Sequence, residues 1–255
     1  HDTRDLSTGI ESSGGPKRYE FGDTMNLDTC ATLFSALRRE GVKIPIELGY
    51  EDLHVHQAEY QSSCATVLML DCSHSMILYG EDRFTPAKKV ALALNSLIKA
   101  QFPRDNLYVV IFSRYAREVK PEVLAGLAWD EEEYGTNLHH ALMLGRKLLA
   151  RHKGGNRQII VVTDGEPTTH LEGEVAHFAY PPVPKTLIET LKEVDRCTKE
   201  RIVINTFMLD RSGPLLEFVN QMAKINRGRA FYCTPDRLGE YVLVDYVTSK
   251  RKRVA

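Results

Sequence analysis

The sequence predicts an α/β fold: a doubly wound, mostly parallel sheet of six strands, with one short antiparallel edge strand and helices on both faces. Four short runs of the chain are almost wholly apolar, and each is followed by a segment with helical periodicity. The composition, 43% hydrophobic and 26% charged over 255 residues, is ordinary for a folded protein. Strands that are apolar on both faces belong to parallel sheets, and their alternation with helices implies right-handed βαβ units.

The first part of the chain does not follow this alternation. Residues 1–16 are rich in Ser, Gly, Thr and charge, so we expect a flexible leader there. Further on, Asp28 can cap a helix that carries Ala31, Phe34 and Leu37 on one face and ends at Gly41, before an extended stretch from Ile44 to Tyr60. We therefore predict that residues 17–62 form a small N-terminal appendage.

The main domain is expected over residues 63–249. Its four apolar strands are residues 66–70, 107–112, 159–162 and 202–209. A short antiparallel edge strand is expected near residues 117–119, and a last strand at residues 230–232. Helices are expected after Thr85-Pro86, from Leu138 to Leu149, from Leu187 to Val194, after Pro214, and after a cap at Thr234-Pro235.

The bulk composition argues against several classes of protein. The 33 basic and 34 acidic side chains give a net charge of −1, so no global field favours nucleic acid or an anionic membrane. No apolar run approaches the ~20 residues that span a bilayer. The five cysteines contain no C-x-x-C pair, which favours reduced thiols and a cytoplasmic location. We expect the basic tail, residues 250–255, to be solvated.

Five oxygen-bearing side chains follow the apolar strands. Asp71 and Asp164 each come directly after a strand, and in the usual doubly wound order these strands are neighbours where the strand order reverses. Ser73 and Ser75 alternate with Cys72 and His74, so both hydroxyls can face the side that Asp71 faces. Thr136 comes just before a helix and can add a third hydroxyl.

This set contains only oxygen donors, which suit Mg²⁺ or Mn²⁺ with their octahedral preference and suit zinc poorly. Singly, a carboxylate at a strand end or a threonine before a helix is more often a cap than a ligand. Together, the five residues favour a metal site. Because neutral hydroxyls leave much of the ion's charge uncompensated, such a site should attract an anion.

The residues Asp71-x-Ser73-x-Ser75, the distant Thr136, and Thr163-Asp164-Gly165 resemble the metal-ion-dependent adhesion site of von Willebrand factor A domains, which have a Rossmann-like fold. The resemblance covers about residues 63–249. It implies that Ser73, Ser75 and Thr136 contact the ion, and that the two aspartates hold it directly or through water. It also implies a protein-interaction module, not an enzyme, in which an Asp or Glu of a partner completes the coordination shell.

Two further runs, residues 73–80 and 226–230, resemble bacterial members of this class akin to the D subunit of magnesium chelatase. Such members typically work beside AAA+ ATPases of the MoxR or chelatase type. The resemblance therefore implies an AAA+ ATPase partner.

Candidates for contact with a partner lie beyond Asp164. Glu166 and Thr168 follow it closely, and Phe178 and Tyr180 lie in the long connection from Leu171 to Pro184. Long connections near a site are often functional, although a passive surface loop is an equally good interpretation.

Two other functions remain open at this point. A metal-assisted hydrolase or phosphotransfer enzyme could use Asp71 and Asp164 as metal ligands, but the sequence has no G-x-x-x-x-G-K-[ST] or G-x-S-x-G motif. A nucleic-acid-binding protein could use Arg227, Arg229 and the basic C-terminus, but the near-neutral charge weighs against it. The histidines His74, His139 and His140 form no pattern typical of a transition-metal site.

Overall fold

The structure is a computed structural model that describes residues 10–23, 26–60, 63–78, 82–127, 134–152 and 155–251. The chain divides into two compact units, one within His1–Ser62 and the other within Ser63–Arg253. Each unit is described by itself.

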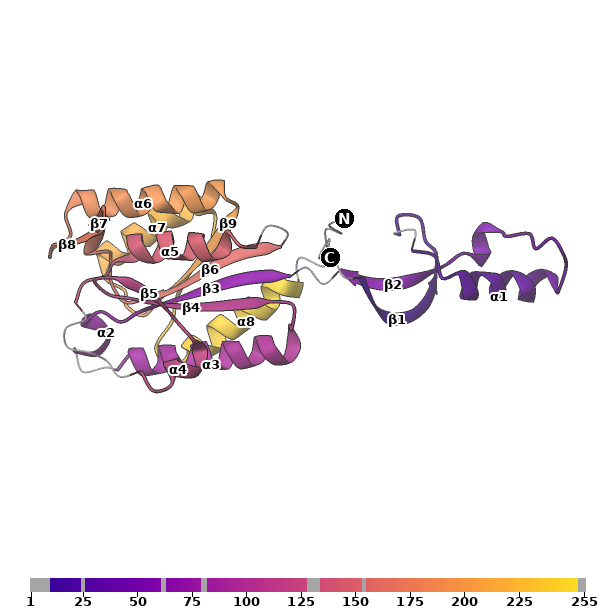
Figure 1. Ribbon diagram of the computed structural model, residues 1–255, viewed down its shortest axis with the longest axis horizontal. Helices are drawn as coiled ribbons and strands as arrows, with labels where there is room; N and C mark the ends of the chain where they lie inside the picture. The colour runs from indigo at the N-terminus through magenta and orange to yellow at the C-terminus, as the bar shows by residue number, and fades with distance from the viewer. Residues whose placement is uncertain are drawn as a thin grey trace. The chain divides into compact units, whose positions relative to one another are not determined.

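The larger unit is built on one six-stranded sheet with the strand order β10-β9-β6-β3-β4-β5 (Figure 1). All neighbouring strands are parallel except β4 and β5, which are antiparallel. The predicted fold class, including the antiparallel edge strand, is confirmed. The strands are β3 (Cys64–Asp71), β4 (Asn106–Phe112), β5 (Ala116–Val119), β6 (Asn156–Thr163), β9 (Ile202–Met208) and β10 (Ala230–Tyr232).

The central strand, β3, is buried along its whole length. Its side chains alternate between the two faces of the sheet, so Val67 and Met69 belong to one hydrophobic core, and Leu68 and Leu70 belong to the other. Burial on both faces is why this strand is a continuous apolar run in the sequence.

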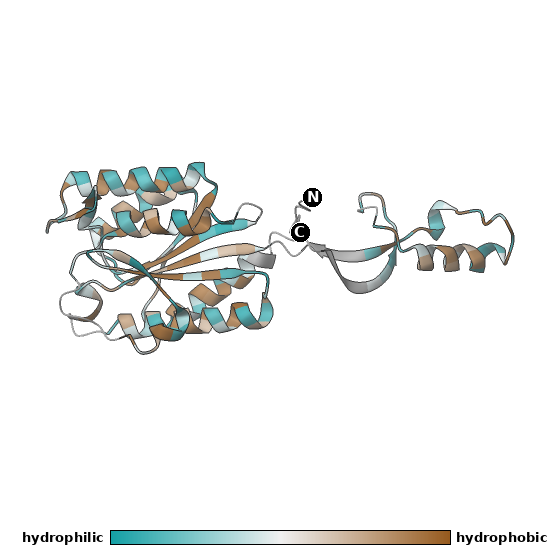
Figure 2. Ribbon diagram, in the orientation of Figure 1, coloured by the Kyte–Doolittle hydropathy of each residue, from teal (hydrophilic) through white to brown (hydrophobic). Residues whose placement is uncertain are grey.

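Helices cover both faces of the sheet, and the hydrophobic central strands lie between the two helical layers (Figures 1 and 2). Helices α5, α6 and α7 pack on one face, and α3, α4 and α8 pack on the other. A further short helix, α2, follows β3. The helices are α2 (Ser75–Leu78), α3 (Phe84–Gln101), α4 (Pro121–Leu124), α5 (Leu138–Leu149), α6 (Pro184–Lys199), α7 (Gly213–Asn226) and α8 (Leu238–Arg251).

Two helix starts differ from the sequence prediction. Helix α3 begins at Phe84, with Arg83 and not Thr85 at its N-cap, and the Thr85 amide donates a hydrogen bond to Asp82 Oδ1 at 2.8 Å. Before α8, the predicted cap at Thr234-Pro235 lies in a turn in which the Arg237 amide donates to the Thr234 carbonyl. In both places side-chain and turn hydrogen bonds decide the boundary.

The connection between β6 and α6 is more ordered than expected. It contains an antiparallel hairpin, β7 (Thr169–Glu172) and β8 (Val175–Phe178), that turns at Gly173 with a φ of 63°. The expected long loop therefore includes a rigid two-stranded element.

The smaller unit pairs β1 (Ile10–Arg18) with β2 (His54–Tyr60), in antiparallel register, and carries helix α1 (Thr29–Glu40) and the 3-10 turn η1 (Tyr50–Asp52). A strand thus replaces the expected flexible leader over residues 10–16, in which residues 10–12 and Pro16 pair with β2 across an irregularity in register. The rest of that leader, residues 1–9, lies outside the described residues.

Helix α1 begins and ends as predicted. Asp28 accepts a hydrogen bond from the Ala31 amide at 2.9 Å, and Gly41 follows the helix with a φ of 75°. The buried residues of α1 are Thr32 and Ala36, however, and Phe34 of the predicted apolar face is 70% exposed.

At the other end of the chain, Lys250 and Arg251 of the expected basic tail lie in α8, and residues 252–255 lie outside the described part. Across the described helices, none combines the length and the apolar character that crossing a bilayer requires.

Candidate metal centre

The predicted metal ligands lie at the carboxyl end of the sheet. Strands β3 and β6 are parallel neighbours, with Leu70 opposite Val162, so Asp71 and Asp164 emerge at the same edge. Both aspartates are buried. The structure thus confirms that the two strands are neighbours, as the sequence predicts.

Asp71 is held by two hydrogen bonds. Its Oδ2 accepts from the Thr163 hydroxyl at 2.6 Å, and its Oδ1 accepts from the Ser73 amide at 2.9 Å. Burial, together with the charge of Asp164, raises the pKa of Asp71 to about 7. A cation bound beside Asp71 would therefore favour the ionised carboxylate, whose charge the two hydrogen bonds compensate only in part.

The two serine hydroxyls join this aspartate loop to Asp164. The Oγ atoms of Ser73 and Ser75 lie 3.1 Å apart, and the Ser75 hydroxyl donates to Asp164 Oδ1 at 2.7 Å. Burial raises the pKa of Asp164, while the bonds from Ser75 and Arg83 oppose that rise. Four of the five predicted ligands are therefore gathered in one place.

The intervening Cys72 turns away from this cluster, as the alternation of the loop predicts. Its amide and its Sγ both approach the Phe112 carbonyl, at 2.9 and 3.2 Å, and its side chain belongs to the core beneath α3. Burial of Cys72 therefore anchors the loop to β4.

Thr136, the fifth predicted ligand, is fixed at the same edge of the sheet by its backbone. Its amide donates to the Thr168 hydroxyl at 2.8 Å, and its carbonyl accepts from the amides of Thr168 and Thr169. The next amide, of Asn137, donates to the Ser113 carbonyl, which follows β4. Within the described residues, no hydrogen bond links Thr136 directly to the other four ligands.

Gly135 allows the Thr136 loop to pack this closely. Its φ is 81°, and a Cβ atom there would lie 2.4 Å from the Thr169 hydroxyl and 3.1 Å from the Phe178 ring. Only glycine avoids both the backbone strain and the clash.

The donor set fits a hard divalent cation. It consists of two buried carboxylates and three hydroxyls, and the Thr136 hydroxyl has no hydrogen-bond partner within the described ranges. Over the same part of the chain, no three His, Cys, Asp or Glu side chains gather in a way that could hold an ion. A set made only of oxygen donors, with two carboxylates among them, matches the preference of Mg²⁺ or Mn²⁺.

Sequence reasoning missed one charged residue of the site. Arg83 precedes α3, and its Nη1 lies 3.1 Å from Asp164 Oδ2 and 3.9 Å from Asp210 Oδ2. Only the fold brings Arg83 near Asp164, which lies 81 positions later in the chain. The one signal in the sequence is the position of Arg83 just before the first crossover helix.

The predicted partner-contact residues have different surroundings. Phe178 is 47% exposed and Tyr180 is 78% exposed, whereas Glu166 is half-buried. Thr168 is buried and supports the Thr136 loop, so it offers no surface to a partner, which corrects the expectation from the sequence.

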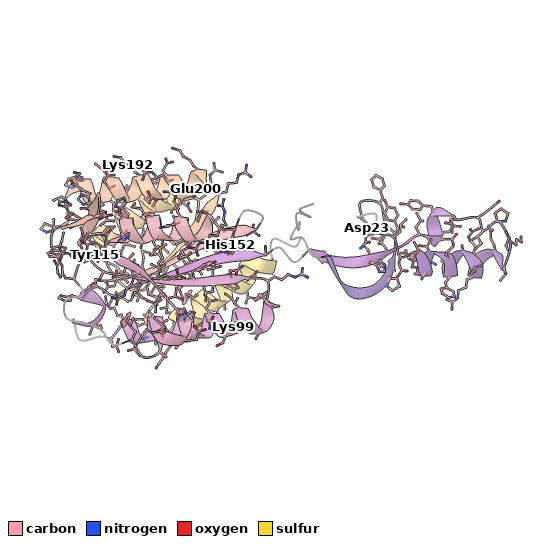
Figure 3. All side chains as sticks on the ribbon, in the orientation of Figure 1. Asp23, Lys99, Tyr115, His152, Lys192 and Glu200 are labelled. Atoms are coloured by element: carbon pink, nitrogen blue, oxygen red, sulfur yellow. The ribbon has the colours of Figure 1, made fainter. Side chains whose placement is uncertain are left out.

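Loops at this edge share further contacts. The Phe178 ring packs edge-on against Tyr134, with centroids 5.3 Å apart, and the Tyr115 hydroxyl accepts from the Ala176 amide of the hairpin. Figure 3 places Tyr115 at this end of the sheet, and Lys99 and His152 toward the other end. The hairpin and the loop after β4 thus form one rim beside the predicted metal ligands.

The histidines and arginines that the sequence left open have structural contacts. His139 accepts from the Leu171 amide and His140 from the Ala116 amide. Arg229 pairs with Asp245 at 2.7 Å, and Arg227 closes helix α7 in a left-handed conformation. His74 is half-buried beside the two serines.

Comparison with known proteins gives two matches to family models. The model described as "Rv0959-like protein, vWA domain" matches residues 64–247. The model described as "Rv0959-like protein, third domain" matches residues 11–58.

Curated relatives include the uncharacterized protein Rv0959 of Mycobacterium tuberculosis and the uncharacterized protein Mb0984 of Mycobacterium bovis. Each is 36% identical to this chain over 258 residues, which cover 98% of this chain and 38% of the relative. This chain therefore spans 38% of the length of these curated relatives.

Three solved structures have a similar fold. The pilus adhesin SpaC of Lactobacillus rhamnosus GG has a TM-score of 0.59 at 15% identity, covering 76% of this chain and 31% of its own. An aerotolerance-related membrane protein of Bacteroides fragilis has a TM-score of 0.54 at 15% identity, covering 74% and 99%. BatB of Bacteroides thetaiotaomicron has a TM-score of 0.53 at 13% identity, also covering 74% and 99%. At these identities the likeness concerns the fold alone.

Proposed function

Since this chain belongs to the family of Rv0959-like proteins with a von Willebrand factor A (vWA) domain, we propose that it binds a protein partner through a Mg²⁺ or Mn²⁺ ion. Domains of this kind are generally protein-interaction modules. The proposed ligands are Asp71, Ser73, Ser75, Thr136 and Asp164, and the proposed site is a metal-ion-dependent adhesion site.

One observation carries this proposal: the buried carboxylates of Asp71 and Asp164 are linked through two serines. The Ser73 amide donates to Asp71, the hydroxyls of Ser73 and Ser75 lie 3.1 Å apart, and the Ser75 hydroxyl donates to Asp164. Two buried carboxylates are costly to keep ionised unless a cation or several donors compensate them. Thr163 and the Ser73 amide orient Asp71, and Ser75 orients Asp164, so both oxygen sets are held in place before an ion arrives.

The hydroxyls of Ser73, Ser75 and Thr136 are neutral, so only the two aspartates can compensate the charge of a divalent ion, and Asp164 is already paired with Arg83. When bound, the ion would supply a positive charge with a coordination position open to a further oxygen. An Asp or Glu side chain of a partner has the charge and the geometry to take that position.

The partner that we propose is an AAA+ ATPase of the MoxR or chelatase type, in whose complex this chain would act as a scaffold or adaptor. Support comes from the resemblance of residues 73–78 and 226–230 to chelatase D-like proteins; the remaining residues of that first run, 79 and 80, lie outside the described part. The exposed rim residues Phe178 and Tyr180 would contact the same partner.

A cytoplasmic location is also part of the proposal, since all five cysteines are free thiols. The alternatives, a metal-assisted hydrolase and a nucleic-acid-binding protein, gain no support from the family match or from the geometry. The proposed function is therefore binding without catalysis.

Isothermal titration calorimetry of the full chain with MgCl₂ and MnCl₂ tests the proposal. We expect one ion per chain in the wild type, and loss of binding in the double variant Asp71→Asn, Ser73→Ala, which keeps the side-chain sizes close to the original. Asp195→Asn, on the exposed face of α6, is the matched control and should bind as the wild type does. Equal binding by the wild type and the double variant would remove the metal site from consideration.

A further inference from the structure

Arg83 is the charged side chain that contacts the candidate metal centre without belonging to the predicted ligand set. Its Nη1 donates to Asp164 Oδ2 at 3.1 Å, and the side chain of Arg83 is only 15% exposed, while that of Asp164 is fully buried. The Arg83 amide donates to the Met76 carbonyl, which fixes the backbone of Arg83 beside α2.

Because of this contact, each carboxylate oxygen of Asp164 accepts a hydrogen bond from a different donor. Oδ1 accepts from the Ser75 hydroxyl and Oδ2 accepts from Arg83, so both oxygens are engaged. Within the described ranges, no other Lys or Arg side chain forms an ion pair with Asp164 or Asp71. Arg83 is therefore the cation, among the described residues, that compensates this buried pair.

A second carboxylate lies within reach of Arg83. Asp210 follows β9 at the same edge of the sheet, and its Oδ2 is 3.9 Å from Arg83 Nη1, at the outer limit of an ion pair. Asp210 is about half exposed, in contrast to the buried Asp164. A small displacement of the guanidinium would therefore move Arg83 from the buried carboxylate of Asp164 to the partly solvated carboxylate of Asp210.

From this geometry we propose that Arg83 is an internal cation that competes with the divalent ion for Asp164, and that Asp210 receives Arg83 when the ion binds. The inference rests on the proposed function and adds the residue that sets the metal affinity. Arg83 is a positioning residue, since it acts through Asp164.

Arg83 should lower the affinity of the site for the divalent ion through two physical effects. A carboxylate oxygen in a charge-assisted bond to a guanidinium has less negative charge to offer a metal, and a fixed positive charge beside the site repels a second cation. Arg83 also orients Asp164, which by itself would favour metal binding. The Ser75 hydroxyl already performs that orienting role through Oδ1, so we expect the charge of Arg83 to outweigh it.

The sign of the effect on metal affinity separates these two roles. Calorimetry of the full chain with MgCl₂ should show tighter binding in Arg83→Met, roughly tenfold or more on the scale of changes beside metal ligands. Arg83→Lys keeps the charge and should bind close to the wild type. Without metal, Arg83→Met should melt at a lower temperature than the wild type, and saturating MgCl₂ should raise its melting temperature more than that of the wild type.

The role of Asp210 is tested by a double-mutant cycle. Asp210→Asn removes the proposed second acceptor and should weaken MgCl₂ binding in the wild-type background. In the Arg83→Met background the same substitution should not change the affinity for MgCl₂, because there is no guanidinium for Asp210 to pair with. Asp195→Asn, far along α6, is the control for loss of one exposed negative charge.

The outcomes distinguish this inference from the proposed function. If the wild type binds the ion and Arg83→Met binds it equally or more weakly, Arg83 supports the ligand, and competition is overturned. If Asp210→Asn acts equally in both backgrounds, Asp210 does not receive Arg83. If neither the wild type nor Arg83→Met binds MgCl₂ or MnCl₂, the metal site itself fails, and the competition fails with it.

Discussion

The hydroxyl of Ser75 donates a 2.7 Å hydrogen bond to Oδ1 of Asp164, a residue 89 positions later in the chain. Ser75 is the first residue of α2, and Asp164 directly follows β6. One neutral hydroxyl thus connects the loop after β3 to the loop after β6.

The stability of the metal-free protein should depend on pH through Asp71. Its pKa is raised to about 7 in the folded protein, from an ordinary value of 3.8. Between these values the folded chain binds more protons at this position than the unfolded chain does. The favourable contribution is therefore full below roughly pH 4 and is lost as the pH rises to about 7.

Thermal unfolding in the presence of a chelator, from pH 4 to pH 8, measures this dependence. Asp71→Asn, which does not titrate, should show a smaller fall in melting temperature across that window than the wild type. Asp195→Asn should keep the slope of the wild type. A slope unchanged by Asp71→Asn would show that Asp71 does not titrate in this range.

Thr136→Ala should weaken binding of the ion and of the partner without unfolding the domain. The substitution removes the hydroxyl but leaves the backbone bonds of residue 136 to Thr168 and Thr169. Calorimetry should therefore show a lower affinity in Thr136→Ala, while its melting temperature stays close to that of the wild type. Thr136→Ser, which keeps the hydroxyl, should bind as the wild type does. A large fall in melting temperature with unchanged affinity would identify Thr136 as a structural residue only.

Gly135→Ala should destabilise the larger unit by about 1–3 kcal/mol, because it adds a left-handed non-glycine residue and a clash with the Thr169 hydroxyl. Gly173→Ala is the matched control, since its φ is also positive but no atom lies within 4 Å of the added Cβ. Urea denaturation should show a greater loss for Gly135→Ala. Equal losses would mean that the loop yields to the added methyl group.

A pull-down from native extract tests the partner. With MgCl₂ present, mass spectrometry should identify an AAA+ ATPase, and excess chelator should release it. Asp164→Ala should mimic the chelator, and Asp195→Ala should not. A complex that persists unchanged in chelator, or the absence of any ATPase with metal present, contradicts the proposed partner.

Tyr180→Ala should weaken partner binding by about 1–2 kcal/mol, since aromatic side chains that become buried in an interface commonly dominate its energy. Tyr180 is 78% exposed, so the substitution removes little from the fold, and Mg²⁺ binding should not change. Ile188→Ala, another exposed apolar residue, on α6, is the control. Equal partner affinity in the wild type and Tyr180→Ala would exclude this side of the rim.

Much of the main domain could be predicted because its strands are apolar on both faces. The short apolar runs that contain Leu70 and Ile160, alternating with helical segments, are typical of a covered parallel sheet, and that sheet brings the ends of β3 and β6, with Asp71 and Asp164, to the same edge. The position of the two proposed aspartate ligands at one edge of the sheet therefore follows from local pattern and strand order.

Other features depend on contacts that are distant in the sequence. The sequence predicts Thr168 as a residue of the rim, but the Thr136 loop covers it. Arg83 comes near Asp164 only in the folded chain. Phe34 fits an apolar helix face, yet the smaller unit buries Thr32 instead, whose hydroxyl accepts from the His54 amide of β2. Local periodicity does not contain this information.

Strand β3 is hydrogen-bonded on both sides, to β4 and to β6, and every one of its residues is buried. We therefore expect its amide protons to exchange with solvent only when the sheet opens. The loop of Asp71, Ser73 and Ser75 continues directly from this strand, so a ligand held there is coupled to the slowest-opening part of the domain. An ion bound at this loop would thus lower the rate of hydrogen exchange with solvent for amides across the entire sheet. The affected amides would include those far from any ligand atom.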